Sequence, residues 1–111
     1  MTSWMIVAGD YGGRYKAIVE DLDLSDCTAT IDVWLGDTLL IDGQACGDVT
    51  YDETEEESYC YYTVADGDFP LTAIVDNRRT IYMVMVKFIK SGYVEHDLGF
   101  QWIVVPPPPT S

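Results

Sequence analysis

Few side chains in this 111-residue chain are suited to catalysis. His96 is the only histidine, and histidine is the side chain whose ordinary pKa lies closest to neutrality. It stands beside Glu95 and Asp97, and the chain has neither a second histidine nor the Gly-x-Ser-x-Gly turn of a serine nucleophile. This pattern favours a surface histidine over a general base. We therefore predict no catalytic residue and a protein that is not an enzyme.

The three cysteines give no metal or nucleophile pattern. Cys27, Cys46 and Cys60 can form at most one disulfide, which leaves one thiol over. Their spacing contains no Cys-x-x-Cys pair, so it matches no zinc site. The sequence shows no evident basic partner that would lower the pKa of a cysteine. We expect reduced, half-buried thiols.

Acidic segments are the remaining candidates for cation binding. Residues 21–26 alternate acids as a calcium loop does, but lack its glycine and its downstream bidentate glutamate. The sequence Asp66-Gly67-Asp68 is ordinary turn chemistry. Residues 52–57 hold five acids in six positions, which is typical of a solvated loop, with cation binding or a basic partner as alternatives. We predict no metal site and no cofactor.

Overall charge and hydropathy exclude several classes of partner. The chain has 19 acidic and 6 basic residues, and its net charge of -13 repels nucleic acid and anionic membranes. The acid excess fits either a high-salt environment or a basic partner. No apolar run approaches the roughly 20 residues of a spanning helix, and the first residues do not resemble a signal peptide. An apolar fraction of 48% predicts a folded domain.

Alternating apolar and polar residues predict a chain that is almost entirely β. On residues 27–35 the odd positions are apolar, which indicates one buried face, and Trp34 falls on the other face. Turns are expected at Gly36-Asp37, Asp42-Gly43 and Ser91-Gly92. The expected strands cover residues 4–8, 14–20, 27–35, 38–41, 45–51, 58–64, 80–90 and, in two pieces, 93–96 and 99–105. Seven or eight short antiparallel strands of this kind predict a β-sandwich.

We divide the chain into a β-sandwich over residues 1–105 and a proline-rich arm over residues 106–111. Proline cannot donate to a strand ladder, so the proline run ends the last strand and predicts a stiff polyproline II segment. Eight Tyr and three Trp are many for this length, and such residues are enriched at protein interfaces. The predicted partner-contact residues are Trp4, Tyr11, Trp34, the basic pair Arg78 and Arg79, Tyr93, Pro106, Pro107, Pro108 and Pro109.

The order of strands and turns along the chain can be compared with that of known domains. An opening strand ends in Gly9-Asp10, an alternating strand follows Leu24-Ser25-Asp26, and an Asp-containing turn follows residues 63–65. A tyrosine-containing strand begins at Thr80, and residues 100–105 close the domain. Over nearly the whole chain this order resembles the N-terminal immunoglobulin-like domain of the tailed-phage baseplate upper protein family, and related small virion domains.

The resemblance implies an immunoglobulin-like fold and a non-enzymatic structural role in a tailed virus particle, as a capsid decoration, neck, tail or baseplate accessory protein. It implies localisation in the virion and partners among other virion subunits, as a homo-oligomer or part of a symmetric assembly. Two departures are residues 77–79, where the family has a glycine, and the lack of an extension after Val105, which favours a free-standing accessory piece. The alternative is a cell-surface or glycan-binding module in which aromatic rings stack on sugar and acids hold calcium.

Overall fold

The structure, a computed structural model, describes residues 3–76 and 78–107. Its elements are β1 (Ser3–Val7), β2 (Arg14–Glu20), β3 (Thr28–Leu35), β4 (Thr38–Ala45), β5 (Thr50–Asp52), β6 (Glu57–Thr63), the short 3-10 helix η1 (Leu71–Ala73), β7 (Thr80–Lys90) and β8 (Tyr93–Val105). Within the described ranges there is no α-helix, and no helix is long and apolar enough to cross a membrane. The predicted all-β class is confirmed.

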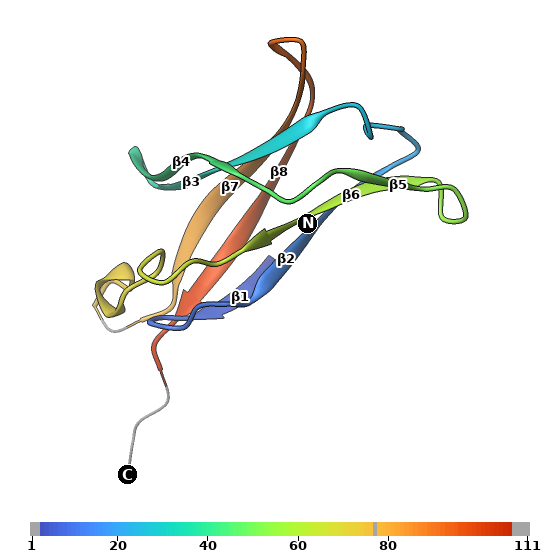
Figure 1. The fold of residues 1–111 in the computed structure, drawn as a ribbon. Coiled ribbons are helices and arrows are strands. Elements are labelled where there is room, and N and C mark those ends of the chain that lie inside the picture. Colours follow the sequence, from blue (N-terminus) through green and yellow to red (C-terminus); the bar gives the residue numbers. More distant parts are fainter. Residues whose placement is uncertain (1–2, 77, 108–111) are drawn as a thin grey trace.

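The strands form two layers (Figure 1). One sheet has five strands in the order β1-β8-β7-β3-β4, and the other has three in the order β2-β6-β5. Side chains from both sheets meet in one core, where the ring centroids of Trp102 on β8 and Tyr62 on β6 lie 5.9 Å apart. The fold is therefore sandwich-like, with two sheets packed across a shared apolar interior.

One strand pair departs from the predicted antiparallel arrangement. β1 runs parallel to β8, with Ser3 opposite Gln101 and Val7 opposite Val105. After β1 the chain crosses to β2 in the other sheet, so β1 pairs with the last strand instead of forming a hairpin. β7 and β8 are the longest strands, with 11 and 13 residues, and the predicted strand over residues 80–90 already has the length of β7.

The predicted turn at Asp42-Gly43 is wrong, because β4 continues through both residues. The pairing of β3 with β4 shifts register between Ile31 and Val33. Gly43 has a φ of +61°, which glycine adopts without a steric penalty, and its N–H donates to the Asp32 carboxylate at 2.6 Å. Asp42 and Gly43 therefore lie at an irregularity within a paired strand and do not form a turn between two strands.

Other strand boundaries follow the sequence closely. β2 and β7 have the predicted bounds, and hairpins occur at Gly36-Asp37 and Ser91-Gly92 as expected. Both Ser91 and Gly92 have positive φ, which suits the twist of a tight hairpin. The predicted strand over residues 45–51 is reduced to the three-residue β5, which pairs with β6. The two predicted pieces of the last strand are one continuous strand.

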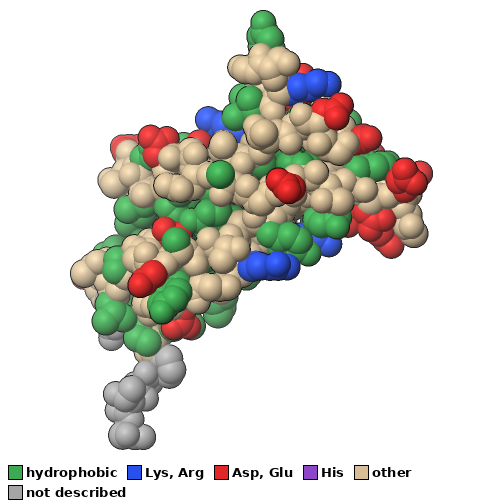
Figure 2. Space-filling view, in the orientation of Figure 1, with side chains coloured by type: hydrophobic (Ala, Val, Ile, Leu, Met, Phe, Trp, Pro, Cys, Tyr) green, Lys and Arg blue, Asp and Glu red, His purple; other side chains and the backbone are tan. Residues whose placement is uncertain are grey.

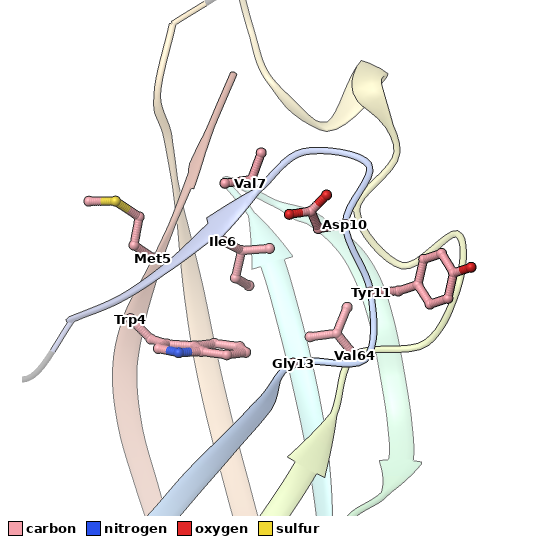
Figure 3. Close-up of a pocket in the computed structure, with 8 residues that line it drawn as sticks. All are labelled: Trp4, Met5, Ile6, Val7, Asp10, Tyr11, Gly13 and Val64. Atoms are coloured by element: carbon pink, nitrogen blue, oxygen red, sulfur yellow. The ribbon is translucent and has the colours of Figure 1, made fainter. Parts of the chain in front are cut away.

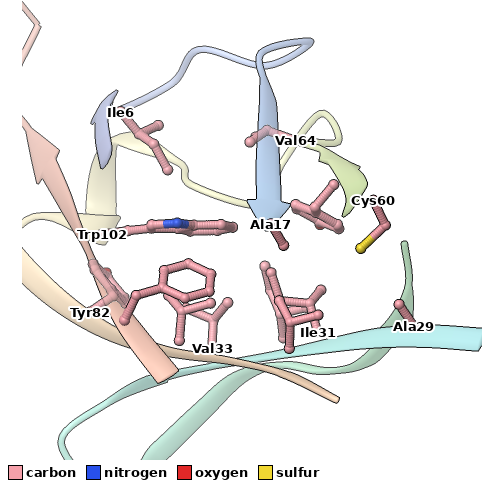
Figure 4. Packing of buried hydrophobic residues seen from close by; sticks show 14 of the residues in the cluster. Ile6, Ala17, Ala29, Ile31, Val33, Cys60, Val64, Tyr82 and Trp102 are labelled. Atoms are coloured by element: carbon pink, nitrogen blue, oxygen red, sulfur yellow. The ribbon is translucent and has the colours of Figure 1, made fainter. Parts of the chain in front are cut away.

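The core is centred on Trp102, whose side chain is fully buried (Figure 4). As the alternation predicts, Ala29, Ile31 and Val33 of β3 face inward. Burying a branched side chain such as Ile31 or Val33 contributes about 1.5–3 kcal/mol to folding. Five aromatic rings from both sheets and from their connections lie within 6.0 Å of the Trp102 ring, centroid to centroid: Trp4, Tyr15, Tyr62, Phe69 and Phe100.

Two buried hydroxyl groups fasten connecting segments to the sheets. The Tyr82 hydroxyl on β7 donates to the carbonyl of Ala73 in the connection before β7. The Ser58 hydroxyl on β6 donates to the carbonyl of Leu22 at 2.6 Å and accepts the N–H of Leu24 at 2.7 Å. Since both chain segments would otherwise leave backbone groups without partners, these contacts fix the connections that enter β3 and β7.

Candidate functional site

The outward side of the five-stranded sheet carries apolar side chains where an exposed sheet face is usually polar. β7 shows this pattern clearly. Its inward residues Tyr82 and Val84 are buried, and the outward residues beside them are apolar as well. On that outward side Ile81 is 49% exposed and Met83 is 46% exposed. A strand that is apolar on both sides is typical of a sheet that is covered on both sides.

Strand register joins apolar residues of all five strands into one surface. On one row β1, β8 and β7 contribute Met5, Ile103 and Ile81, each opposite the next. On the neighbouring row Met83 lies opposite Trp34 of β3, which lies opposite a leucine of β4. We call this surface the outer apolar face, and its residues are Met5, Trp34, Leu39, Ile81, Met83 and Ile103.

An ion pair borders the outer apolar face. The Lys87 ammonium lies 3.3 Å from a carboxylate oxygen of Asp32. Asp32 is almost completely buried although it is on the outward side of β3, and its second oxygen accepts the N–H of Gly43. The six side chains of the outer apolar face are themselves uncharged, in a chain of net charge -13.

The outward side of the three-stranded sheet has a different chemistry. The Arg14 guanidinium lies 4.1 Å from the centroid of the Tyr61 ring, and the Lys16 ammonium lies 4.4 Å from that of Tyr59. The two tyrosine rings meet edge to face at 5.9 Å. We call these four residues the tyrosine–cation face. Figure 2 shows basic side chains beside hydrophobic ones over this sheet, with acidic side chains gathered towards the β5–β6 loop.

A small pocket lies between β1 and the loop that follows it (Figure 3). Its volume is about 310 Å³, and it is lined by Trp4, Met5, Ile6, Val7, Asp10, Tyr11, Gly13 and Val64. The loop is held against the chain after β6, because the Gly12 N–H donates to the Val64 carbonyl at 2.8 Å. Among the described residues that line it, the pocket has one carboxylate and no histidine, cysteine, serine or basic side chain. The pocket is a mainly apolar recess.

His96 lies half-buried on β8, and its ring centroid is 6.3 Å from that of Phe88. It lines a groove of about 490 Å³ with Glu20 and Glu57, which lie opposite each other on β2 and β6. The described lining of the groove contains one histidine and two glutamates, and no serine, threonine or cysteine. The groove therefore lacks a side-chain nucleophile for this histidine to activate.

The predicted contact residues separate into three regions. Trp4 is partly buried and belongs to the core, since its ring centroid lies 5.1 Å from that of Trp102. Trp34 is half-exposed in the outer apolar face. Tyr93 is exposed where β8 begins, at the tip of the β7–β8 hairpin (Figure 1).

The other predicted contact residues lie near the opposite end of the sandwich. Tyr11 is exposed in the β1–β2 loop, and Arg78 and Arg79 are exposed just before β7. Pairing of Thr80 with Val104 sets this basic pair near the end of β8, where Pro106 is half-buried and Pro107 is exposed. Pro108 and Pro109 lie outside the described residues.

Sequence reasoning missed most of the outer apolar face. It singled out Trp34 but not Met5, Leu39, Ile81, Met83 or Ile103. A usable signal was present on residues 80–90, where apolar residues occupy both parities. Such a double pattern indicates a strand that is covered on both sides.

The acidic segments use their carboxylates within turns. Asp23 accepts the N–H of Ser25 at 3.0 Å and its hydroxyl at 2.6 Å, and these hydrogen bonds lower the pKa of Asp23. Asp26 forms an exposed ion pair with Lys90 at 3.7 Å. Residues 53–56 are exposed, as predicted for a solvated loop. Within the described ranges, no three acidic, histidine or cysteine side chains gather as metal ligands would.

Comparison with known proteins adds no relative: no protein-family model matches the chain, and no curated protein matches its sequence.

Proposed function

We propose that this chain is a non-enzymatic, immunoglobulin-like domain that serves as a structural subunit of a tailed virus particle. It acts by protein–protein contact, and its partners are other virion subunits, including copies of itself in a symmetric assembly. The assignment to a virion rests on the resemblance of its segments to virion domains. The mode of action rests on the geometry of the sheets.

The strand order supports an immunoglobulin-like arrangement. In such sandwiches the second, fifth and fourth strands form one sheet, and the sixth, seventh and third form the other. Here the chain order is the same once β4 is set aside as an additional strand: β2-β6-β5 is one sheet, and β8-β7-β3 is the centre of the other, with the first strand β1 at its edge beside β8. The extra β4 extends the larger sheet in the manner of a variable-type domain.

Tyr82 gives a second, local argument for this fold. Many immunoglobulin-like domains carry a tyrosine near the start of the sixth strand whose hydroxyl bonds to the backbone a few residues upstream. The Tyr82 hydroxyl makes such a bond to Ala73. Two departures are Val84, which occupies the position of the second cysteine, and the central tryptophan, which is Trp102 on β8 instead of a residue of β3.

The observation that carries the function is the outer apolar face. Six apolar side chains from five strands lie next to one another on this side of the larger sheet. Contiguous exposed apolar patches of this kind mark interaction sites on water-soluble domains. With a net charge of -13, two copies or two acidic partners can approach closely only where the surface is neutral. The outer apolar face meets that condition, and its exposed apolar side chains suit a partner subunit with a complementary apolar surface.

A pair of matched variants tests this function. Met83→Glu sets a charge in the outer apolar face, and Ile18→Glu makes the same kind of change on the outer side of β2, in the other sheet. In particles purified from the host and quantified by mass spectrometry, Met83→Glu should reduce incorporation by tenfold or more while Ile18→Glu leaves it close to wild type. Equal incorporation of both variants, or absence of the wild-type chain from particles, would contradict the proposal.

Glycan binding has weaker support. One face of the Tyr59 ring is covered by Lys16 and one face of the Tyr61 ring by Arg14, which reduces the area open to a sugar. The exposed Tyr11 and Tyr93 lie at opposite ends of the sandwich, so they cannot form one stacking site. Calcium-dependent retention of the chain on an immobilised oligosaccharide would favour this alternative.

A further inference from the structure

Cys46 and Cys60 bring two thiols together where the two sheets meet. Cys46 directly follows β4 of the five-stranded sheet, and Cys60 lies in the middle of β6 of the three-stranded sheet. The segment after β4 is held to both sheets, since the Cys46 N–H donates to the Ala29 carbonyl at 2.9 Å and the Gly47 N–H donates to the Tyr61 carbonyl at 2.8 Å. Because Gly47 is paired with Tyr61, the residues that directly precede them, Cys46 and Cys60, are neighbours across this junction, and each thiol shifts the pKa of the other.

The two thiols differ in access to solvent. Cys60 is fully buried, whereas Cys46 is partly exposed and lines a groove of about 590 Å³ on the surface. The neighbouring Cys60 thiol lowers the pKa of Cys46, whereas the Cys46 thiol and burial raise the pKa of Cys60. The thiol that small molecules can reach is therefore also the one that more readily becomes a thiolate, which is the nucleophilic form.

Cys27 provides an internal comparison. It lines the same groove, but its side chain is buried, and burial raises the pKa of its thiol. All three cysteines are free thiols in the structure, but the prediction that they are half-buried holds for Cys46 alone, since Cys27 and Cys60 are buried. Of the three, only Cys46 is both partly exposed in the groove and next to a second cysteine across the junction of the sheets.

We propose that Cys46 and Cys60 form a redox-active pair that closes into a disulfide when a small-molecule disulfide, such as oxidised glutathione, reaches the groove. The Cys46 thiolate attacks one sulfur of the small disulfide, which forms a mixed disulfide and releases one thiol. The Cys60 sulfur then attacks the Cys46 sulfur, and the second small thiol leaves. The protons of the two cysteines end on the two released thiols, and the two electrons lost by the protein reduce the small disulfide.

The product would be a covalent link between the two sheets. In the reduced chain the five-stranded and three-stranded sheets are joined by connecting segments, by hydrogen bonds such as that from the Gly47 N–H to the Tyr61 carbonyl, and by core packing. A disulfide from Cys46 to Cys60 would restrict the unfolded chain and stabilise the packed pair of sheets. Oxidation would thus lock the sandwich without changing the outer apolar face, which lies on the other side of the larger sheet.

The test uses the purified full chain, reduced and then treated with oxidised glutathione at pH 8. Free thiols counted after denaturation should fall from three to one. Cleavage after glutamate separates residues 21–53, which contain Cys27 and Cys46, from residues 58–95, which contain Cys60, so the expected link joins two different peptides in mass spectrometry. The melting temperature of the oxidised chain should rise by roughly 10 °C or more, and reductant should reverse the rise.

Variants separate this pairing from the others. Cys27→Ser should keep both the cross-link and the rise in melting temperature, whereas Cys46→Ser should lose both. Brief alkylation of the native wild-type chain should label Cys46 before Cys60, which tests the order of reactivity without any substitution. The proposal is overturned if oxidation links Cys27 to Cys46, if Cys46 stops at the mixed disulfide with glutathione, or if all three thiols remain free.

Discussion

The two outer faces of the sandwich are built from the same strand alternation and differ in the residues that point outward. The outer apolar face spans five strands with methionine, isoleucine, leucine and tryptophan side chains. The tyrosine–cation face, on the smaller sheet, stacks Arg14 and Lys16 on tyrosine rings. The outer apolar face leaves apolar side chains exposed, whereas on the tyrosine–cation face the basic side chains cover the tyrosine rings.

This difference indicates which face is free to bind. Lysine and arginine stems that cover aromatic rings shield apolar area while their charges remain in water. The tyrosine–cation face therefore stabilises the domain in isolation and needs no other protein. On the outer apolar face Ile81 and Met83 remain 49% and 46% exposed, so covering them with a partner would bury further apolar area.

The largest expected effect concerns the core that both faces share. Trp102→Ala should destabilise the domain by about 3–5 kcal/mol, because it leaves a cavity among five aromatic rings from both sheets. Urea denaturation measures the loss. Trp102→Phe should cost less, since it keeps most of the packing and removes an indole N–H that has no hydrogen-bond partner among the described residues. If Trp102→Ala cost less than 1 kcal/mol, the two layers would not depend on a common core.

Binding should separate the two faces next. Trp34→Ala in the outer apolar face should weaken attachment to particles prepared without the chain by about 2 kcal/mol, or roughly thirtyfold in dissociation constant, as expected of a buried aromatic contact. Tyr61→Ala, the matched aromatic truncation on the tyrosine–cation face, should leave attachment within about twofold. A larger loss for Tyr61→Ala would reverse the assignment of the faces. Both variants should be compared at equal folded fraction.

Alkaline pH should distinguish core tyrosines from surface ones. Burial raises the pKa of Tyr82, so its neutral form is favoured in the folded chain. The stability that this provides is present below the unfolded pKa of about 10 and is lost as pH rises further, towards the raised folded value. Tyr82→Phe should cost about 1 kcal/mol at neutral pH and make stability less dependent on pH above 10. Tyr93→Phe, at an exposed position, should leave that dependence unchanged.

The smallest effect should come from the tyrosine–cation face itself. Lys16→Ala removes the ammonium above Tyr59 and should cost about 0.5–1 kcal/mol in stability, as exposed cation–ring contacts do. Attachment to particles should not change. Thermal unfolding of Lys16→Ala beside Glu20→Ala, a nearby change on the same strand without a ring partner, isolates the contact. A cost equal to that of Glu20→Ala would mean that the stacking contributes nothing.

Much of the fold could be predicted because alternation and turn chemistry act locally. The bounds of β2 and β7 and the hairpin at Ser91-Gly92 follow from residues that are adjacent in sequence. The parallel pairing of β1 with β8 could not, since it joins strands almost a hundred residues apart. The Asp42-Gly43 error has a similar origin, because Asp32 on another strand supplies the acceptor that keeps Gly43 within β4.

The candidate site was predicted less well than the fold. Counting aromatic residues pointed to Trp4 and Trp34 alike, but Trp4 packs on Trp102 while Trp34 lies on an outer surface. The outer apolar face depends on register across five strands, which one strand's pattern does not contain. The contact between Cys46 and Cys60 likewise arises only when the two sheets pack, so spacing along the chain gave no sign of it.

Hydroxyl-radical footprinting tests the central claim most directly, because methionine and tyrosine side chains both react readily. Methionines mark the outer apolar face, and tyrosines mark the tyrosine–cation face. Met5 and Met83, which are 62% and 46% exposed, should be modified rapidly in the isolated chain and be protected by tenfold or more in purified particles that contain it. Tyr59 and Tyr61 should react at similar rates in both samples. Unprotected methionines in the particle, with protection confined to Tyr59 and Tyr61, would contradict the account.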